Sequence, residues 1–136
     1  LVKSTRTAGA GVAITNGPGS IAISSSGAVD WSVVTGATNA EVNSGYFCNH
    51  GAVRVVVTLP DTAAVGDVLR IAGIGAAGWE VAQNAGEKIY ADDDSTTAGI
   101  TGYLRSTGTY DCIELICFSA NTDWLMLSSS GNITIA

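Results

Sequence analysis

The most conspicuous shortage in this 136-residue chain is of charge, because only 13% of its residues are charged, about half the usual globular share. Six basic residues stand against twelve acidic ones, giving a net charge of −6 and an isoelectric point near 4.4. Binding a nucleic-acid backbone needs clustered lysine and arginine, so a nucleic-acid partner is not expected. No apolar run reaches the roughly 18 residues of a membrane helix, so no membrane insertion is expected either.

Lysine and glutamate, which favour helices on a protein surface, are also scarce, whereas the chain has 17 glycines. Apolar and polar residues alternate in short stretches, which is the period of a half-buried strand. In residues 28–34, for example, Val29, Trp31 and Val33 fall on one face and Asp30 and Ser32 on the other. The strands predicted in this way cover residues 11–15, 21–24, 28–34, 46–48, 53–59, 68–74, 79–83, 88–90, 100–105, 110–118, 124–127 and 133–135.

Turn-forming residues recur every eight to twelve positions or so, which is typical of a sandwich or barrel. The only helical candidate is a single turn at residues 61–65. We therefore predict an all-β protein, a single antiparallel β-sandwich or jelly-roll-like domain with a strand-like N-terminal extension. Residues 1–20 are the predicted extension, which could act as an exchanged strand, and residues 21–136 form the predicted sandwich.

Three cysteines leave at least one thiol without an intramolecular partner. Cys112 and Cys117 lie on one predicted strand, where five extended residues span about 16 Å, beyond the roughly 7 Å that a disulfide allows between Cα atoms. Any intramolecular disulfide would therefore join Cys48 to one of these two. The alternative is that all three are small buried hydrophobic residues.

Four runs of sequence resemble a known family: residues 59–71, 78–86, 110–115 and 121–134. From about residue 52 onward the chain is similar to C-terminal β domains of phage tail fibres and related bacterial surface proteins. The resemblance implies a β-rich, often trimeric module that faces a receptor or caps a shaft, on a virion or cell surface. It implies no catalytic residues.

Motifs that could carry catalysis or a cofactor are weak. Residues 73–78 match G-x-G-x-x-G after a predicted strand, but the helix that would receive a pyrophosphate is missing, so a glycine-rich hairpin turn is favoured. The single histidine, His50, is too close to Cys48 along one strand to form a catalytic pair. Asp111 and Glu114 are three positions apart on a strand and should face opposite ways. We predict no enzyme and no cofactor.

Two weaker binding sites remain as alternatives. Asp92, Asp93 and Asp94 offer clustered oxygen atoms to Ca²⁺, although the EF-hand spacing is absent, and a solvated acidic loop is favoured. Six aromatic residues could stack on sugar rings or pack in the core. They are Trp31, Trp79, Tyr90, Tyr103, Tyr110 and Trp124, and of these Trp79, Tyr90 and Tyr103 are the predicted glycan-stacking residues.

The main functional prediction is self-association into a homotrimer or a helical filament. A small sheet of apolar strands needs its edges covered, and charges that would protect them are rare here. Val12 and Ile14 lie on the predicted exchanged strand, and Ile113, Leu115 and Phe118 on a strand that is apolar on both faces; these five are the predicted assembly residues. The alternative function is an adhesin module at a fibre tip that binds a cell-surface glycan or receptor.

Overall fold

The computed structural model describes the backbone of residues 12–17, 20–25 and 29–136, and side chains from residue 29 onward. No helix occurs in these residues, and nothing in them is a helix long and apolar enough to cross a membrane. The strands are β1 (Val12–Gly17), β2 (Ser20–Ser25), β3 (Asp30–Val34), β4 (Thr38–Asn39), β5 (Ser44–Cys48), β6 (Val55–Thr58), β7 (Val68–Gly73), β8 (Trp79–Ala82), β9 (Lys88–Ala91), β10 (Asp94–Ser95), β11 (Tyr103–Ser106), β12 (Cys112–Ser119), β13 (Asp123–Ser130) and β14 (Ile133–Ile135).

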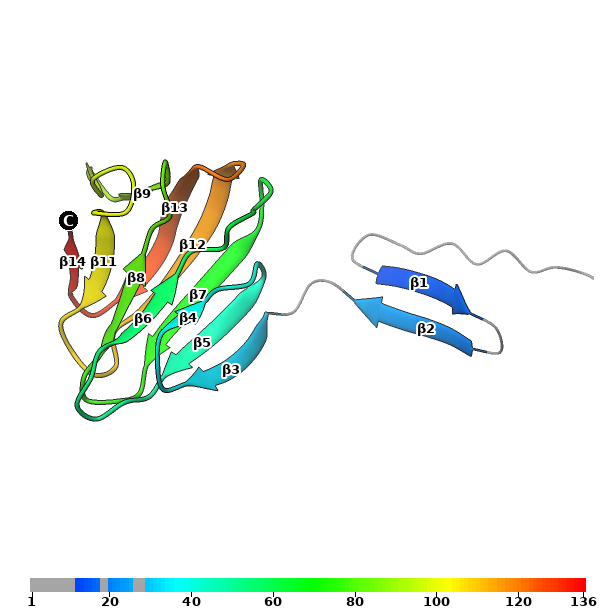
Figure 1. Ribbon diagram of the computed structural model, residues 1–136, viewed down its shortest axis with the longest axis horizontal. Coiled ribbons are helices and arrows are strands. Elements are labelled where there is room, and N and C mark those ends of the chain that lie inside the picture. Colours follow the sequence, from blue (N-terminus) through cyan, green and yellow to red (C-terminus); the bar gives the residue numbers. More distant parts are fainter. Residues whose placement is uncertain (1–11, 18–19, 26–28) are drawn as a thin grey trace, which may run out of the picture.

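Two sheets pack face to face to form a sandwich, as Figure 1 shows. The larger sheet, called sheet B here, has seven strands in the order β10-β9-β13-β12-β7-β5-β3. The smaller one, called sheet C, has five strands in the order β14-β11-β8-β6-β4. The all-β sandwich prediction is therefore confirmed.

From β3 to β8 the chain alternates between the two sheets and winds as a short solenoid. β3, β5 and β7 are parallel neighbours in sheet B, and β4, β6 and β8 are parallel neighbours in sheet C. Each coil contributes one strand to each sheet, so three coils are stacked: β3 with β4, β5 with β6, and β7 with β8. The sheets are mixed, and the prediction of purely antiparallel pairing was too narrow, because the connections here are arches between sheets and not hairpins.

The third coil is covered by antiparallel strands from the C-terminal half of the chain. In sheet B, β12 pairs with β7 and then with β13. In sheet C, β11 pairs with β8 and then with β14. At the opposite end no strand of the described residues covers the first coil, because β3 and β4 are both terminal strands of their sheets.

The core lies between the sheets and consists of the inward-facing residue of each alternating pair. In β7, for example, Leu69 and Ile71 are fully buried, while Arg70 between them faces outward and is half-buried. Trp79 and Trp124 are the largest side chains that are completely buried. Trp79 is also tied by its indole Nε1, which donates to the Asp111 carbonyl at 2.8 Å.

The glycine-rich segment of residues 73–78 is the arch between β7 and β8 and lies against the preceding coil. The amides of Ile74 and Gly75 both donate to the Cys48 carbonyl, at 2.9 and 3.0 Å. A Cβ on Gly75 would collide with the His50 backbone, which explains the glycine. The predicted turn is present, but it is not the hairpin that the sequence suggested, because it joins β7 of one sheet to β8 of the other.

The N-terminal hairpin is separate from both sheets. β1 pairs only with β2, in a six-residue antiparallel register from Val12↔Ser25 to Gly17↔Ser20 (Figure 1). The sandwich therefore starts at Asp30, later than the predicted boundary at residue 21, because residues 20–25 pair with β1. The predicted helical turn at residues 61–65 is a bend and not a helix.

Candidate functional site

The predicted assembly residues of β12 lie on opposite faces of sheet B. Ile113 and Leu115 point between the sheets and are 4% and 0% exposed, so they belong to the core of their own subunit and the prediction was wrong for them. Phe118 is on the outer face and 47% exposed. Val12 and Ile14 lie on β1, and their side chains are outside the described residues.

The three predicted glycan-stacking residues lie in three different places in the sandwich. Trp79 is wholly buried in the core, so it cannot receive a sugar, and the prediction was wrong for it. Tyr90 is half-buried on the outer face of sheet B, packed edge-on against Phe118 with ring centroids 5.5 Å apart. Tyr103 is half-buried on the outer face of sheet C, where the Arg105 guanidinium covers its ring at 4.2 Å. The two tyrosines lie on different sheets and form no common platform.

Asp92, Asp93 and Asp94 lie at the β9–β10 hairpin. Asp92 and Asp93 form the two-residue turn, with Asp92 at a φ of 51°, a conformation that aspartate tolerates better than most residues. In the part of the chain that the structure describes, no group of three or more His, Cys, Asp or Glu side chains is arranged to hold an ion.

Cys48 and His50 occupy different environments. Cys48 is fully buried, and this burial raises the pKa of its thiol to about 12. The His50 Nδ1 accepts hydrogen bonds from the amides of Ala52 and Val53, at 3.1 and 2.8 Å, which fixes a turn. All three cysteines are free thiols, with Cys112 partly buried and Cys117 buried.

Asp111 and Glu114 are separated as predicted. One carboxylate oxygen of Asp111 accepts from the amides of Thr107 and Gly108, at 2.8 and 2.7 Å, and organises that loop. Glu114 faces outward from β12 and pairs with Arg70 of β7. Neither arrangement brings two carboxylates to one reacting bond.

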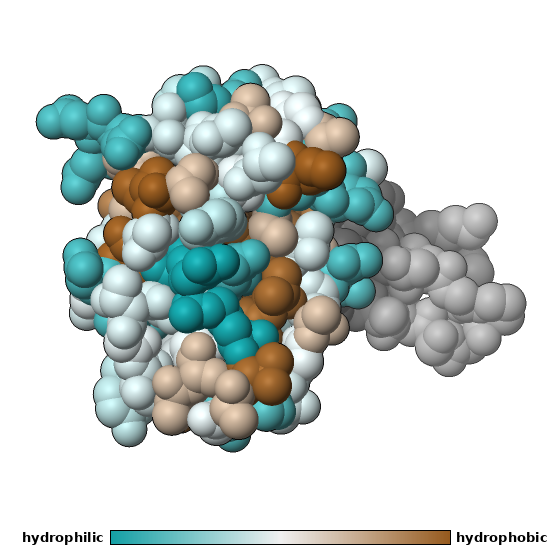
Figure 2. Space-filling view, turned by 60° about the vertical axis from the view of Figure 1, so that its left-hand side comes forward, coloured by the Kyte–Doolittle hydropathy of each residue, from teal (hydrophilic) through white to brown (hydrophobic). Residues whose placement is uncertain are grey.

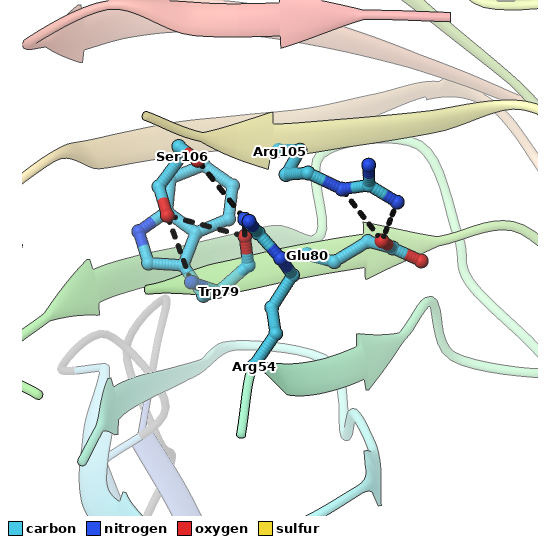
Figure 3. Close-up of polar contacts among 5 residues, drawn as sticks. All are labelled: Arg54, Trp79, Glu80, Arg105 and Ser106. Carbon is cyan, nitrogen blue, oxygen red and sulfur yellow. Dashed lines mark hydrogen bonds and ion pairs between the residues drawn. The ribbon is translucent and has the colours of Figure 1, made fainter. Parts of the chain in front are cut away.

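Polar contacts, shown in Figure 3, tie the outer face of sheet C together across its strands. The Arg105 Nε donates to the Glu80 carboxylate at 2.9 Å, and the Arg54 guanidinium donates to the Ser106 carbonyl at 3.0 Å. Figure 2, which brings the β14–β11 side of the molecule forward, shows hydrophilic residues gathered near the middle of the face. Hydrophobic residues form separate groups around them, so this view offers no continuous apolar surface for a partner.

A buried polar cluster holds together the segment between β8 and β11, which contains β9 and β10. The side-chain amide of Gln83 donates to the carbonyls of Glu87, Thr97 and Gly99, at 2.7, 3.0 and 3.0 Å. The Glu87 carboxylate accepts from the Asn84 amide at 2.6 Å, and its burial raises its pKa. These groups form hydrogen bonds with one another and with the backbone of this segment, so their role is structural.

The first coil presents an unpaired strand edge at β3. The Asp30 amide donates to the Asn43 carbonyl at 3.3 Å, and the Val34 carbonyl accepts from the Asn49 amide at 2.8 Å. The even-numbered residues of β3 therefore turn their backbone groups toward β5. Because these groups alternate along a strand, the amides and carbonyls of Trp31 and Val33 point to the open side.

This edge is the least protected one of sheets B and C in the described residues. β4, β10 and β14, the other three terminal strands of the two sheets, contain only two or three residues, whereas β3 contains five. Natural proteins protect edges with short strands and charges, and β3 carries one charge, Asp30 at its start. The side chains of Trp31 and Val33 on this strand are 43% and 58% exposed.

A cavity of about 400 Å³ lies at the open end of the first coil, between β3 and β4. Tyr46 closes its floor, and its hydroxyl accepts from the Glu41 amide at 2.9 Å. Most of the other lining residues are polar: Asp30, Ser32, Thr38, Asn39, Glu41 and Ser44. Association at this end would therefore depend on backbone pairing and not on apolar burial.

The chain was also compared with known proteins. No protein-family model matches it, and no curated protein sequence matches it.

Proposed function

We propose that this chain is a non-enzymatic structural subunit of an extended extracellular assembly, a phage tail fibre or a surface filament, which self-associates through β-strand edges. The observation that supports this most directly is the open coil end. β3 offers a five-residue edge with free amides and carbonyls, and a strand added there would gain a ladder of main-chain hydrogen bonds.

The donor in this proposal is the N-terminal hairpin of a neighbouring subunit. A two-stranded hairpin is only marginally stable alone in water, and β1 and β2 pair with no other strand in the described residues. Within the part of the chain that the structure describes, neither the hairpin nor the open coil end pairs with a further strand. Pairing them between subunits gives a head-to-tail contact, which builds a helical filament unless the rotation closes it into a ring such as a trimer.

The extracellular setting rests on a different argument. The resemblance inferred from the sequence, to C-terminal β domains of phage tail fibres and bacterial surface proteins, would imply a virion or cell-surface location, although no family model matches the chain. A net charge of −6 with few lysines fits a partner other than nucleic acid. Both are reasons for the proposal and are independent of the edge geometry.

Electron microscopy and light scattering on the full chain test the assembly directly. We expect filaments or discrete oligomers, and we expect a variant lacking residues 1–25 to be a folded monomer, since the described core cluster begins at Ala40. A variant lacking only residues 1–11 keeps the hairpin and is the matched control. Polymer that survives removal of residues 1–25 would rule out the hairpin donor, and a full chain that stays monomeric at all concentrations would rule out assembly.

The second candidate function is a carbohydrate- or receptor-binding adhesin module at a fibre tip. One observation favours it: aromatic residues are exposed on the outer face of sheet B, with Trp31 and Phe118 each more than two-fifths accessible. Exposed aromatic rings are frequent in recognition surfaces because they supply a large contact area at low entropic cost.

A further inference from the structure

The outer face of sheet B contains a groove of about 300 Å³ that runs across four of its strands. Its floor is formed by small side chains: Ala72 of β7 and Cys112 of β12, which are direct cross-strand neighbours. One wall is the Trp31 indole of β3, and the other is the serine run at the end of β13. The hollow exists because these two small residues lie between larger walls.

Trp31 is held in place by its neighbours. Its ring covers Gly45 of β5, where any Cβ would collide with it, and stacks on Phe47 with centroids 4.4 Å apart and an interplanar angle of 25°. The side chain therefore leans away from the open edge and toward β7. A flat aromatic surface is fixed before any ligand arrives, which lowers the entropy lost on binding.

Polar groups surround the floor of the groove. The Arg70 Nε donates to one oxygen of the Glu114 carboxylate, and in the described residues neither the two other guanidinium nitrogens nor the second carboxylate oxygen has another hydrogen bond. Ser128 and Ser130, the register partners of the outward-facing Glu114 and Cys112, bring hydroxyl groups to the same face of the sheet. The groove thus combines an apolar plate with both donors and acceptors at its rim.

We propose that this groove binds one neutral hexopyranose unit of a glycan, with an apolar face of the sugar against Trp31 and its hydroxyls on Arg70, Glu114 and the serines. Adjacent sugar hydroxyls suit the forked geometry of guanidinium and carboxylate groups. The guanidinium and the carboxylate neutralise each other, and the chain is acidic overall, so an anionic sugar is disfavoured. The volume fits a single ring near the lower limit of ligand sites.

The groove is distinct from the assembly edge and does not depend on it. It uses none of the three predicted stacking residues, since Trp79 is in the core and the two tyrosines lie outside the lining. A failure of sugar binding would leave the edge proposal intact, and the reverse also holds.

Two built-in reporters make the test direct. Trp31 is 43% exposed while the other two tryptophans are fully buried, so a ligand-dependent change in tryptophan fluorescence reports on the groove. Cys112 is the only one of the three thiols that is not buried, so a bound sugar should slow its alkylation by a maleimide. The probes are the methyl glycosides of glucose, galactose and mannose, together with N-acetylglucosamine, titrated into the full chain.

We expect at least one probe to shift the fluorescence and protect Cys112, with a dissociation constant on the order of 1 mM for a single sugar unit. Trp31→Ala should weaken protection of Cys112 by about tenfold or more, and Glu114→Gln should also weaken it. Phe118→Ala removes an equally exposed aromatic from the same sheet face outside the groove, and it should bind as the original chain does.

Three results would overturn the proposal. The first is that no probe changes either reporter near its solubility limit. The second is that a probe protects Cys112 equally well in Trp31→Ala. The third is that Trp31→Ala converts an oligomer to a monomer while no sugar has any effect, which would assign the groove to a second copy of this chain.

Discussion

A pair of proline substitutions at neighbouring positions of β3 tests which side of this strand is open. The Ser32 amide faces β5, whereas the Val33 amide faces the unpaired edge, as the bonds at Asp30 and Val34 indicate. Proline removes the backbone donor, and strands tolerate it only where that donor is not needed. Ser32→Pro should therefore damage the sandwich, and Val33→Pro should spare it.

The size of the difference follows from one ladder hydrogen bond. Losing the Ser32 donor and leaving its carbonyl partner on β5 without a bond should cost about 1–3 kcal/mol. At roughly 4 °C per kcal/mol for a domain of this size, the melting temperature should fall by about 4–12 °C. Val33→Pro should stay within about 0.5 kcal/mol of the original chain, because its amide faces solvent in the isolated subunit.

Val33→Pro, the substitution that should spare stability, is the one that should abolish assembly. Val33→Pro removes a donor that an added strand would use, so filaments or oligomers should be lost while the melting curve hardly changes. Val33→Ala keeps the amide and is the matched control for the lost side chain. Equal losses of stability at the two positions would contradict the assignment of the open side, and assembly that survives Val33→Pro would show that β3 is not the acceptor.

The remaining predictions concern positions in the core and the loops. Leu115→Ala should lower the free energy of urea unfolding by about 3 kcal/mol, because Leu115 is fully buried. Phe118→Ala should lower it by about 1 kcal/mol or less, because about half of Phe118 is in solvent. Equal losses would contradict the two faces assigned to β12. Asp111→Ala should cost about 2 kcal/mol by leaving the amides of Thr107 and Gly108 unbonded, whereas Asp111→Asn, which keeps an acceptor oxygen, should cost clearly less; similar losses would argue against this role. Because burial raises the pKa of Glu87, its folded state holds the proton more tightly, so stability falls as the pH rises from about 4.3 through the folded pKa. Glu87→Gln should therefore melt above the original chain at pH 8 and lose that advantage near pH 4; an advantage independent of pH would refute the pKa shift.

Strand positions were predictable because they depend on local alternation. The stretch predicted at residues 133–135 is β14, and the one at residues 68–74 contains all of β7 and one residue more. β4 and β10 were not predicted, since two residues are too few to show a period. Alternation assigns residues to faces, however, and does not say which face is inside. In β3 the apolar set of Trp31 and Val33 faces outward, contrary to the usual arrangement.

The solenoid was not predictable because its coils differ in length. The register runs from Asp30 to Ser44 and then to Leu69, so the first two steps within sheet B are 14 and 25 residues long. A repeat with unequal periods leaves no pattern in a single sequence. Hairpins and arches also need similar turn residues, so the glycines of residues 73–78 indicated a turn without indicating which sheet would follow.

Trp79 and Trp31 show that the sequence also did not indicate which aromatic residue is accessible to a ligand. Both are large aromatics on short strands, and the sequence favoured Trp79 as the sugar-binding one. The structure buries Trp79 because its strand has a neighbour on each side and a facing sheet. Trp31 remains accessible because its strand is at an edge and Gly45 beside it leaves room for the ring to lie flat.

The position of Trp31 would allow the two proposed activities, assembly and glycan binding, to occur in one subunit. Its backbone groups point to the open edge, while its side chain leans the other way, over Gly45 and toward β7. A strand added at the edge would therefore extend sheet B without displacing the ring or covering the groove. Each subunit of a filament would then present one groove at a regular spacing, and weak binding of single sugars would become strong through simultaneous contacts. A glycan site with millimolar affinity is useful on such a polymer, whereas on a monomer it would hold very little.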